Sequence, residues 1–239
     1  MSILYLPVFE NEDGVRGFFS TKAGAALKSP YYNKDVLEEL SLEDYKLIWP
    51  KQVHKANVEI IKDIGNKKEV IIPETDGLVT NNPDVLLTTV HADCLAVYFY
   101  DKEQKAIGLV HAGWRGTVKG ISQNAVKIMM CEYNSKPEDI ISFISPGISK
   151  CCFEVGREVY EEFRQKWDFA DEFAEKKGEK YYIDLKGINK RQLLDLGVKN
   201  IQVSSHCTCC NPELFCSYRG EKGVKKRMGA GICLSIKHR

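Results

Sequence analysis

The feature of this sequence that most constrains its fold is a run of three apolar segments between residues 86 and 111, with no room for a helix among them. These segments are rich in Val, Ile, Leu and Tyr, and short polar turns separate them: Leu86 to His91, Leu95 to Tyr100 and Ala106 to His111. Segments that are apolar throughout are typical of strands covered on both faces. The sequence therefore predicts sheets that are packed inside the molecule.

Further strands are expected where short apolar runs are bounded by Gly, Pro, Asn or Asp, namely at Leu78 to Thr80, Ile140 to Ser145, Tyr181 to Leu185, Ile201 to Ser204 and Ile232 to Ile236. Ser2 to Phe9 is also apolar, but it contains Pro7, has no basic residue ahead of it and is followed by no small-residue cleavage site. We therefore expect a first strand there, in a protein that is not exported and stays in the cytoplasm.

Three helices are predicted from apolar residues that recur every three or four positions. They cover Thr117 to Glu132, with Thr117 as the cap, then Val155 to Trp167, then a segment that follows Asp184 and ends at Gly197. Helices placed irregularly between strands indicate mixed sheets, so the expected fold class is α+β, or α/β only in the broad sense. Because no linker or internal repeat interrupts the chain, a single domain over residues 1–239 is expected.

The charge balance argues against two classes of partner. The chain has 34 Lys and Arg against 33 Asp and Glu, a net charge of +1, so no overall field attracts nucleic acid or an anionic membrane. No apolar stretch approaches the ~20 residues that a membrane helix needs. With 44% hydrophobic and 28% charged residues, the composition is that of an ordinary globular protein.

Nine cysteines are an odd number, and several are adjacent or nearly so, which does not suit a disulfide framework. Reduced thiols in a cytoplasm are the better interpretation, and some could be metal ligands. A structural zinc site is one hypothesis for Cys207, Cys209, Cys210 and Cys216, although their spacing departs from that of zinc knuckles. Packed, reduced thiols are the favoured alternative for these four.

His111 is the most suggestive of the five histidines. It ends an apolar strand and opens the turn from His111 to Gly116, after which a helix begins. A strand, a glycine-rich turn and a helix N-terminus together suit an anionic ligand, and Arg115 would add a forked donor there. The alternative is a tight turn in which the histidine caps a backbone carbonyl.

Cys94 lies between two apolar strands, shortly after His91 and directly after Asp93. Alternation along a strand would separate Cys94 from the other two, unless a bend at Ala92 to Cys94 turns all three together. A single cysteine in a strand is usually a small core residue. Here, however, three polar residue types within four positions would be costly to bury without a function.

Together with His54, which precedes another strand-like run, Cys94 and His111 supply two imidazoles and a thiolate. This is the ligand set of a catalytic zinc site, with the fourth corner left open. The same ligands suit a blue-copper centre. A multicopper oxidase, by contrast, needs more imidazoles than five histidines supply. The long separations along the sequence carry no specificity of their own.

Motifs spread over nearly the whole chain occur in the order found in one protein family. They are Gln52-Val53-His54, Asp76 to Thr80, Ala92-Asp93-Cys94-Leu95, His111 to Gly116, Ser145 to Ile148, Asp184-Leu185 leading into Asn189 to Leu193, and Phe215 to Arg219. With these motifs the sequence resembles the YfiH, or laccase-domain, family. The combination of His-Ala-Gly-Trp-Arg-Gly with an upstream Ala-Asp-Cys and Gln-Val-His is highly specific.

The resemblance implies layered mixed β-sheets flanked by helices, in a fold related to cysteine hydrolase-like toxins. It implies a metal, generally zinc, on His54, Cys94 and His111, which match the family's ligands. It also implies a purine nucleoside phosphorylase with adenosine deaminase and methylthioadenosine phosphorylase activity, although the family was first called polyphenol oxidase or laccase. The expected substrates are therefore a purine nucleoside and phosphate.

Under this hypothesis Cys94, His111 and Asp93 are the catalytic residues, and Asp93 is the proton shuttle for the leaving amine. The expected anion partners are Arg115, Lys22 and Arg219. Lys22 stands where the family usually has arginine, so any contact there becomes that of a point charge.

Three other classes of function stay open on the sequence alone. The first is a copper-dependent polyphenol oxidoreductase. The second is a hydrolase with Cys94 as nucleophile and His111 as base, acting on a peptidoglycan amide, since some bacterial members of the family are associated with peptidoglycan editing. The third is a zinc-stabilised scaffold without catalytic activity.

Overall fold

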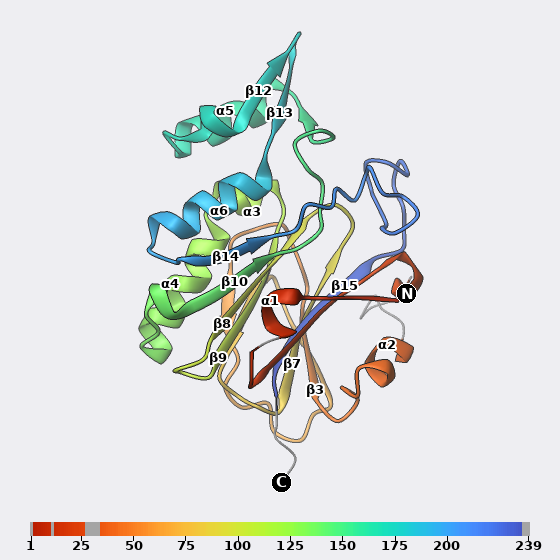
Figure 1. Ribbon diagram of the computed structural model, residues 1–239, viewed down its shortest axis with the longest axis vertical. Helices are drawn as coiled ribbons and strands as arrows, with labels where there is room; N and C mark the ends of the chain where they lie inside the picture. The colour runs from red at the N-terminus through yellow and green to blue at the C-terminus, as the bar shows by residue number, and fades with distance from the viewer. Residues whose placement is uncertain (1, 11, 27–33, 236–239) are drawn as a thin grey trace.

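Two six-stranded sheets form the centre of the molecule in the computed structural model, which describes residues 2–10, 12–26 and 34–235 (Figure 1). The first sheet consists, in spatial order, of β1 (Ile3–Tyr5), β2 (Val15–Ser20), β15 (Met228–Leu234), β7 (Val85–His91), β3 (Lys46–Pro50) and β5 (Glu69–Ile72). The second consists of β14 (Asn200–Val203), β10 (Ile140–Ile144), β8 (Leu95–Asp101), β9 (Ala106–Ala112), β6 (Gly77–Thr80) and β4 (Val58–Ile60).

Both sheets are mixed. Most neighbouring strands run antiparallel, while the described strands pair in parallel at β3 with β5, β3 with β7, β4 with β6 and β10 with β14. The predicted mixed sheets and the α+β fold class are confirmed.

The core fills both faces of the second sheet. On β8, Val97 and Phe99 pack toward the covering helices α3 (Trp114–Val118), α4 (Ile121–Tyr133) and α6 (Leu185–Asp195). The alternate residues Tyr98 and Tyr100 pack with Phe19 of the first sheet. Every residue of β8 and β9 is buried, which confirms that these apolar strands are covered on both faces.

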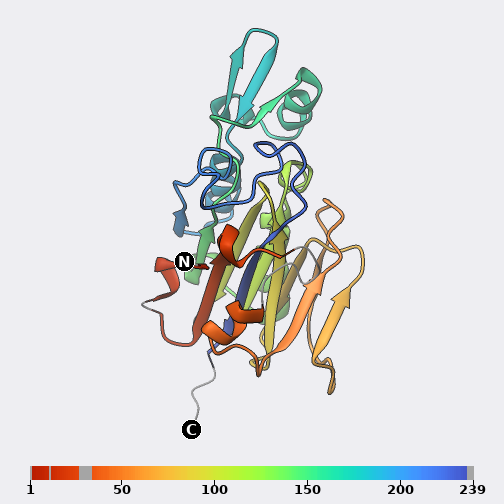
Figure 2. The same ribbon diagram turned by 90° about the vertical axis from the view of Figure 1, so that its right-hand side faces the viewer.

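The outer face of the first sheet is covered by α2 (Lys34–Glu39), whose Val36 packs with Phe18 and Leu86. A small third sheet, β11 (Glu154–Val155), β13 (Lys180–Ile183) and β12 (Ala174–Lys177), projects beyond the large sheets together with α5 (Arg157–Lys166) (Figure 2). Tyr160 of α5 stacks on Tyr181 of β13, with ring centroids 4.1 Å apart. Short 3-10 turns occur at Lys22–Gly24, Pro137–Asp139 and Ala170–Phe173.

Two sequence-based predictions of local structure were wrong. The helix expected from Thr117 to Glu132 is two helices, α3 and α4, because Gly120 adopts a φ of 72°, a left-handed conformation that interrupts the helix. Thr117 lies inside α3 and accepts a hydrogen bond from Asn189, while Gly113 is the N-cap. The strand expected over Ser2 to Phe9 ends early, since Pro7 begins the short helix α1 (Pro7–Glu10).

The other two predicted helices are confirmed as α5 and α6. Asp184 is the N-cap of α6 and accepts a hydrogen bond from the N–H of Gly187 at 3.0 Å, while Gly197 follows the helix with a φ of 94°. The predicted strands are all present, although β15 begins earlier, at Met228, and Ile236 lies outside the described residues. In the described part of the chain, no helix combines the length and apolar character that crossing a membrane would require.

Close packing between β15 and β2 gives a test of this core. Gly231 pairs with Phe18, and a Cβ at Gly231 would lie 2.6 Å from Cζ of the Phe18 ring, which is almost fully buried. We expect Gly231→Ala to lower the free energy of unfolding by about 1–3 kcal/mol, because the overpacked ring cannot move away. Urea denaturation measures the loss.

Gly108→Ala is the matched control, since Gly108 lies in a buried strand of the other sheet and a Cβ there would lie 3.2 Å from its nearest neighbours. It should cost less than Gly231→Ala. Equal losses in the two variants would contradict this packing of Phe18.

Candidate metal centre

A buried carboxylate, that of Asp76, organises one edge of the second sheet. Because Gly77 pairs with Val110, Asp76 lies opposite His111, and its carbonyl accepts the N–H of His111 at 2.7 Å. Its fully buried side chain accepts a hydrogen bond from Nδ1 of His111 at 2.9 Å. The same carboxylate accepts the backbone N–H groups of residues 53–55 at 2.8 to 3.1 Å. One side chain therefore fixes both a strand end and a turn.

The strand register brings three side chains that can ligate a metal to this edge. β8 begins at Leu95, which pairs with Ala112, so Cys94 lies beside the turn that follows His111. The imidazole nitrogens of His54 and His111 and Sγ of Cys94 lie within 4.8 Å of one another. The two imidazole rings are perpendicular, with centroids 4.8 Å apart. The structure thus brings together the three residues that the sequence suggested as ligands.

Two backbone features make this convergence possible. His54 adopts a φ of 58°, in the left-handed region, and the hydrogen bonds from its turn to Asp76 hold it there. At Gly113, a Cβ would lie 3.1 Å from Sγ of Cys94 and 3.3 Å from Cδ2 of His54. A side chain at position 113 would therefore crowd two of the three ligands.

The electrostatics of the group favour a thiolate next to a charged imidazole. Burial alone would raise the pKa of Cys94, but the neighbouring His111 and the hydrogen bond from its ring lower it to about 6. Burial alone would lower the pKa of His111, but the Cys94 thiolate and Asp76 raise it to about 9. Asp76 itself has a lowered pKa, because hydrogen bonds from His111 and Lys55 outweigh the effect of burial.

His91 lies next to His111, with ring centroids 5.5 Å apart. The chain bends at Ala92 to Cys94, the condition that the sequence set for bringing these residues together, since β7 ends at His91 and β8 begins at Leu95. Both ring nitrogens of His91 are engaged, one with Oγ1 of Thr89 at 2.8 Å and the other with the carbonyl of Cys94 at 3.0 Å. Burial, together with the neighbouring His111, holds the pKa of His91 well below its usual value. His91 is therefore a neutral support for the loop that carries Cys94.

The three ligands open onto a cavity of about 450 Å³. His54 is exposed and Cys94 partly exposed, while His111 is buried. The rest of the wall combines apolar and aromatic side chains with polar groups, namely Gln52, Val90, Ala92, Asp93, Trp114, Ile148, Phe153, Leu185, Tyr218, Arg219 and Arg227. A cavity of this size and composition is typical of a site for a small molecule.

Asp93 lies in the cavity wall with a φ of 86°. Oδ1 of its carboxylate accepts a hydrogen bond from Oγ1 of Thr208 at 2.6 Å, and Oδ2 accepts the backbone N–H of Arg219 at 2.7 Å. These bonds join the turn before Cys94 to the long loop between β14 and β15. The carboxylate thus has a fixed place beside the ligands.

Of the three predicted anion partners, the structure places one in the cavity wall and two outside it. Arg219 lines the cavity, with Nη1 3.2 Å from the carbonyl of Cys152. Arg115 is exposed, lies over the ring of Trp114 and does not line the cavity. Lys22 is also outside the lining, because it donates hydrogen bonds to Glu221 and to the carbonyl of Pro212, each at 3.0 Å.

Several residues of the site were not assigned a role from the sequence, namely Asp76, Arg227 and the aromatic residues Trp114, Phe153 and Tyr218 of the cavity wall. Asp76 lies within one of the family motifs, but a carboxylate ahead of a strand looks like an ordinary turn residue. Arg227 lines the cavity from the end of the β14–β15 loop. In the sequence it is the last of three consecutive basic residues, a pattern that is typical of a solvated surface and does not indicate a binding site. The signal that could have found Asp76 is the pairing of β6, which begins directly after Asp76, with β9, which contains His111.

The cysteines of the β14–β15 loop do not group as the zinc hypothesis expected. Cys209 packs against the helix-side core, and Cys216 is fully buried in the core between the sheets. Cys207 and Cys210 instead lie with Cys151 and Cys152. The zinc hypothesis, which the sequence ranked below packed thiols, was therefore wrong in two of its four cysteines.

The donors at the cavity fit a metal ion of the catalytic type. Two imidazoles and a thiolate supply three corners of a tetrahedron, and the cavity lies beside them. Because Nδ1 of His111 bonds to Asp76, Nε2 is the nitrogen left for a metal, an arrangement common in metal centres. Zinc and copper both accept these ligand types. Fold and site together define an α+β protein with a candidate His-Cys-His metal centre.

Comparison with known proteins agrees with this description. Residues 31–235 match the family described as multi-copper polyphenol oxidoreductase laccase. The chain is 37% identical over 190 residues to the purine nucleoside phosphorylase YlmD of Geobacillus stearothermophilus, covering 76% of this chain and 69% of that protein. It is 30% identical over 251 residues to the purine nucleoside phosphorylase YfiH of Escherichia coli K12, covering 98% and 100%.

The fold is shared as well. The crystal structure of the hypothetical protein YfiH of Bacillus licheniformis matches with a TM-score of 0.89 at 29% identity, covering 98% of this chain and 97% of that one. The chain therefore belongs to the multi-copper polyphenol oxidoreductase laccase family, whose members include YfiH and YlmD. The resemblance inferred from the sequence motifs is confirmed.

Asp76→Asn tests the organising role of the buried carboxylate. The amide cannot accept from His111 and from three backbone N–H groups in the same way, so His54 and His111 lose their fixed orientation. We expect the affinity for zinc to fall about 10–100-fold, the usual effect of removing such a partner of a metal ligand. Competition with a chromophoric chelator measures this affinity.

The control is Asp101→Asn. Asp101 is also a buried aspartate that accepts two backbone N–H groups of a turn, but it lies at the other end of β8. Its replacement should lower stability and leave the zinc affinity unchanged. If Asp76→Asn binds zinc as tightly as this control, Asp76 does not orient the ligands.

Proposed function

We propose that this chain is a zinc-dependent purine nucleoside phosphorylase that also phosphorolyses methylthioadenosine and deaminates adenosine. The observation that carries the proposal is the convergence of His54, Cys94 and His111 beside a cavity of about 450 Å³. The names of relatives that match 76% and 98% of this chain support the substrate class. We place the protein in the cytoplasm, because the odd number and close spacing of its cysteines favour reduced thiols.

The lining of the cavity has the two kinds of surface that a nucleoside and phosphate need. Trp114, Phe153 and Tyr218 offer aromatic faces against which a purine ring can stack. Arg219 and Arg227 offer two guanidinium groups for an oxyanion, and guanidinium groups bind phosphate through paired N–H donors. We therefore assign the purine to the aromatic side chains and the phosphate to the two arginines.

His54, Cys94 and His111 would hold a zinc ion, which would supply a Lewis acid to a substrate in the cavity. In phosphorolysis, a phosphate oxygen forms a bond to the anomeric carbon of the ribose while the bond from that carbon to the purine nitrogen breaks. Arg219 and Arg227 hold the phosphate for this attack. In deamination, water adds to the purine carbon that bears the amino group, and the bond from that carbon to the amine breaks. We assign to Asp93, whose carboxylate is fixed by Thr208 and Arg219, the transfer of a proton from this water to the leaving amine.

A cysteine hydrolase is the second candidate, because His111 lies between Cys94 and Asp76. A thiolate, an imidazole and a carboxylate in this order correspond to a nucleophile, a base and the group that orients the base. The raised pKa of His111 and the lowered pKa of Cys94 describe such an ion pair. Its substrate would be an amide such as those of peptidoglycan.

A multicopper oxidase is a poorer fit despite the family's description. The chain has five histidines, and of these His91 is engaged at both ring nitrogens and His111 at one. A set of several copper ions needs more imidazoles than the remainder supply. A single copper ion on the three ligands stays an alternative, and turnover of phenols at stoichiometric copper that is lost when zinc replaces the copper would favour it.

Cys94→Ala tests the proposed function directly. Loss of the thiolate removes one of three ligands, so we expect zinc at this centre to be lost and the turnover of inosine and adenosine to fall at least 100-fold. Product analysis by chromatography, with adenosine and phosphate as substrates, measures this, since adenine and inosine report different reactions. Cys131→Ala, an exposed cysteine on α4, is the control and should keep full activity.

A Cys94→Ala variant with full activity and full zinc content would refute the assignment. Metal-free enzyme distinguishes the second candidate. If the metal-free enzyme hydrolyses a peptidoglycan amide, and iodoacetamide abolishes this hydrolysis by modifying Cys94, the chain is a cysteine hydrolase that does not need the metal.

The assignment of phosphate to Arg219 and Arg227 gives a further test. Arg227→Gln should raise the KM for phosphate about tenfold or more, because a hydrogen bond to a charged group contributes roughly 1.5–3 kcal/mol. The kcat of adenosine deamination, which uses no phosphate, should not change. Arg115→Gln, at the exposed arginine beside Trp114, is the comparison and should leave the phosphate KM as it is. A larger effect at Arg115 would restore the sequence-based assignment.

A further inference from the structure

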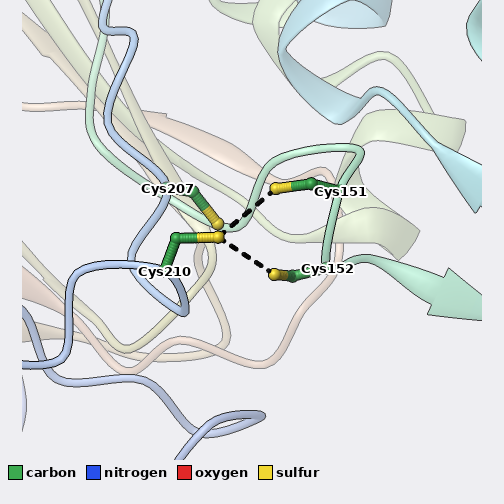
Figure 3. Close-up of side chains that lie close together, drawn as sticks. All are labelled: Cys151, Cys152, Cys207 and Cys210. Carbon is green, nitrogen blue, oxygen red and sulfur yellow. Dashed lines mark hydrogen bonds between the residues drawn. The ribbon is translucent and has the colours of Figure 1, made fainter.

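Four thiols outside the metal centre lie together where two loops run side by side (Figure 3). Cys151 and Cys152 belong to the loop between β10 and β11, and Cys207 and Cys210 to the loop between β14 and β15. Their four sulfur atoms lie within 4.8 Å of one another. Sγ of Cys210 is 3.5 Å from that of Cys151 and 3.3 Å from that of Cys152.

These distances are those of a metal site and not of a disulfide. A tetrahedral zinc ion with bonds of about 2.3 Å to sulfur holds its ligands about 3.8 Å apart. A disulfide bond is about 2.05 Å long and joins only two sulfur atoms. Small movements of the four side chains would therefore bring each sulfur to its place around one ion.

Burial does not explain why the four thiols meet. Cysteines that pack as small apolar residues are among the most buried side chains, as Cys216 and Cys233 are here. Cys151 and Cys210 are exposed, and Cys152 is only partly buried. An apolar core therefore does not account for this cluster.

The backbone around Cys207 is arranged to stabilise a thiolate. The N–H of Ser149 donates to Sγ of Cys207 at 3.4 Å, and the backbone N–H of Cys210 is directed at the same sulfur. The two residues between Cys207 and Cys210 give the Cys-x-x-Cys spacing of zinc knuckles. Hydrogen bonds to ligand sulfurs orient them and support their negative charge.

A buried cation stands next to the cluster. Lys186 is 5% exposed, and its ammonium donates to Oγ of Ser149 and to the carbonyls of Ser204 and His206. It also interacts electrostatically with Cys207 and Cys151. Four thiolates around a divalent ion leave a net negative charge, and an ammonium group at this position offsets part of it.

We propose that Cys151, Cys152, Cys207 and Cys210 bind a structural zinc ion. Four thiolates close the coordination sphere, so the site has no open position for a substrate. The ion joins two loops that also form one wall of the cavity. Thr208 donates its N–H to the carbonyl of Gly147, and Arg219 donates to the carbonyl of Cys152. The zinc thus fixes the wall that carries Arg219.

Zinc content of the full-length protein tests this proposal. Protein purified under reducing conditions without added metal is analysed by mass spectrometry of metals, as wild type and as Cys210→Ser, Cys151→Ser and Cys131→Ser. We expect Cys210→Ser and Cys151→Ser each to hold one zinc equivalent less than wild type, while Cys131→Ser holds as much as wild type. Both exposed ligand positions tolerate serine without a buried cavity, so folding should persist and circular dichroism checks it.

A His54→Ala variant separates this site from the catalytic one. If both sites bind zinc, His54→Ala also loses one equivalent, and the double variant with Cys210→Ser loses two. Loss of zinc on Cys210→Ser but not on His54→Ala supports the four-cysteine site even if the proposed function fails. Replacing zinc with cobalt(II) gives a second readout, since four thiolates produce strong sulfur-to-cobalt charge-transfer absorption. Cys210→Ser should weaken this absorption, leaving the smaller contribution of the single Cys94 thiolate. Unchanged zinc content in both cysteine variants, or a disulfide among these four residues in protein kept reduced, would overturn the proposal.

Discussion

The site depends on one interaction, the burial of the Asp76 carboxylate among its hydrogen-bond donors. A fully buried carboxylate is costly unless it is paired and hydrogen-bonded, and Asp76 accepts from three backbone N–H groups and from Nδ1 of His111. Those donors belong to two separate pieces of the chain. Leaving one of these donors or the carboxylate unpaired would cost free energy, so the turn at residues 53–55 stays attached to the end of β9. His54 keeps its left-handed backbone conformation because this turn cannot relax.

The pairing of the strands turns this local contact into a ligand set. β6, β9 and β8 are consecutive neighbours, and the ends of these strands meet at the same edge of the sheet. Asp76, His111 and Cys94 each stand at such an end, so the distances between them follow from hydrogen bonds in the sheet. A rigid sheet holds metal ligands more accurately than free loops do. Gly113 completes the arrangement by leaving space where a side chain would crowd two ligands.

The sequence predicted the central strands because their apolar runs are unbroken, and it left a bend before Cys94 open as one of two possibilities. It predicted the ligands through motifs and not through spacing, since separations of this length say nothing about contact. The role of Asp76 was missed because it depends on which strand pairs with β6. The division of the first long helix was missed because apolar spacing continues through Gly120, where only the backbone conformation changes. The zinc hypothesis for the β14–β15 loop named the wrong partners for Cys207 and Cys210, because Cys151 and Cys152 come from a different loop.

The two groups of ligands are linked through Asp93. Its carboxylate accepts from Thr208 and from the backbone of Arg219, and the four-cysteine cluster lies on the same pair of loops. Asp93 directly precedes Cys94, so the loop from β14 to β15 is fastened at one point to the catalytic ligands and at another to the cluster. If the loop backbone were free, an anion that binds Arg219 would have to order this backbone as well as the side chain, and ordering the backbone costs free energy. Fastening the loop at two points lowers that cost for Arg219, and this is a physical reason for the proposed structural ion to stand beside the proposed catalytic one.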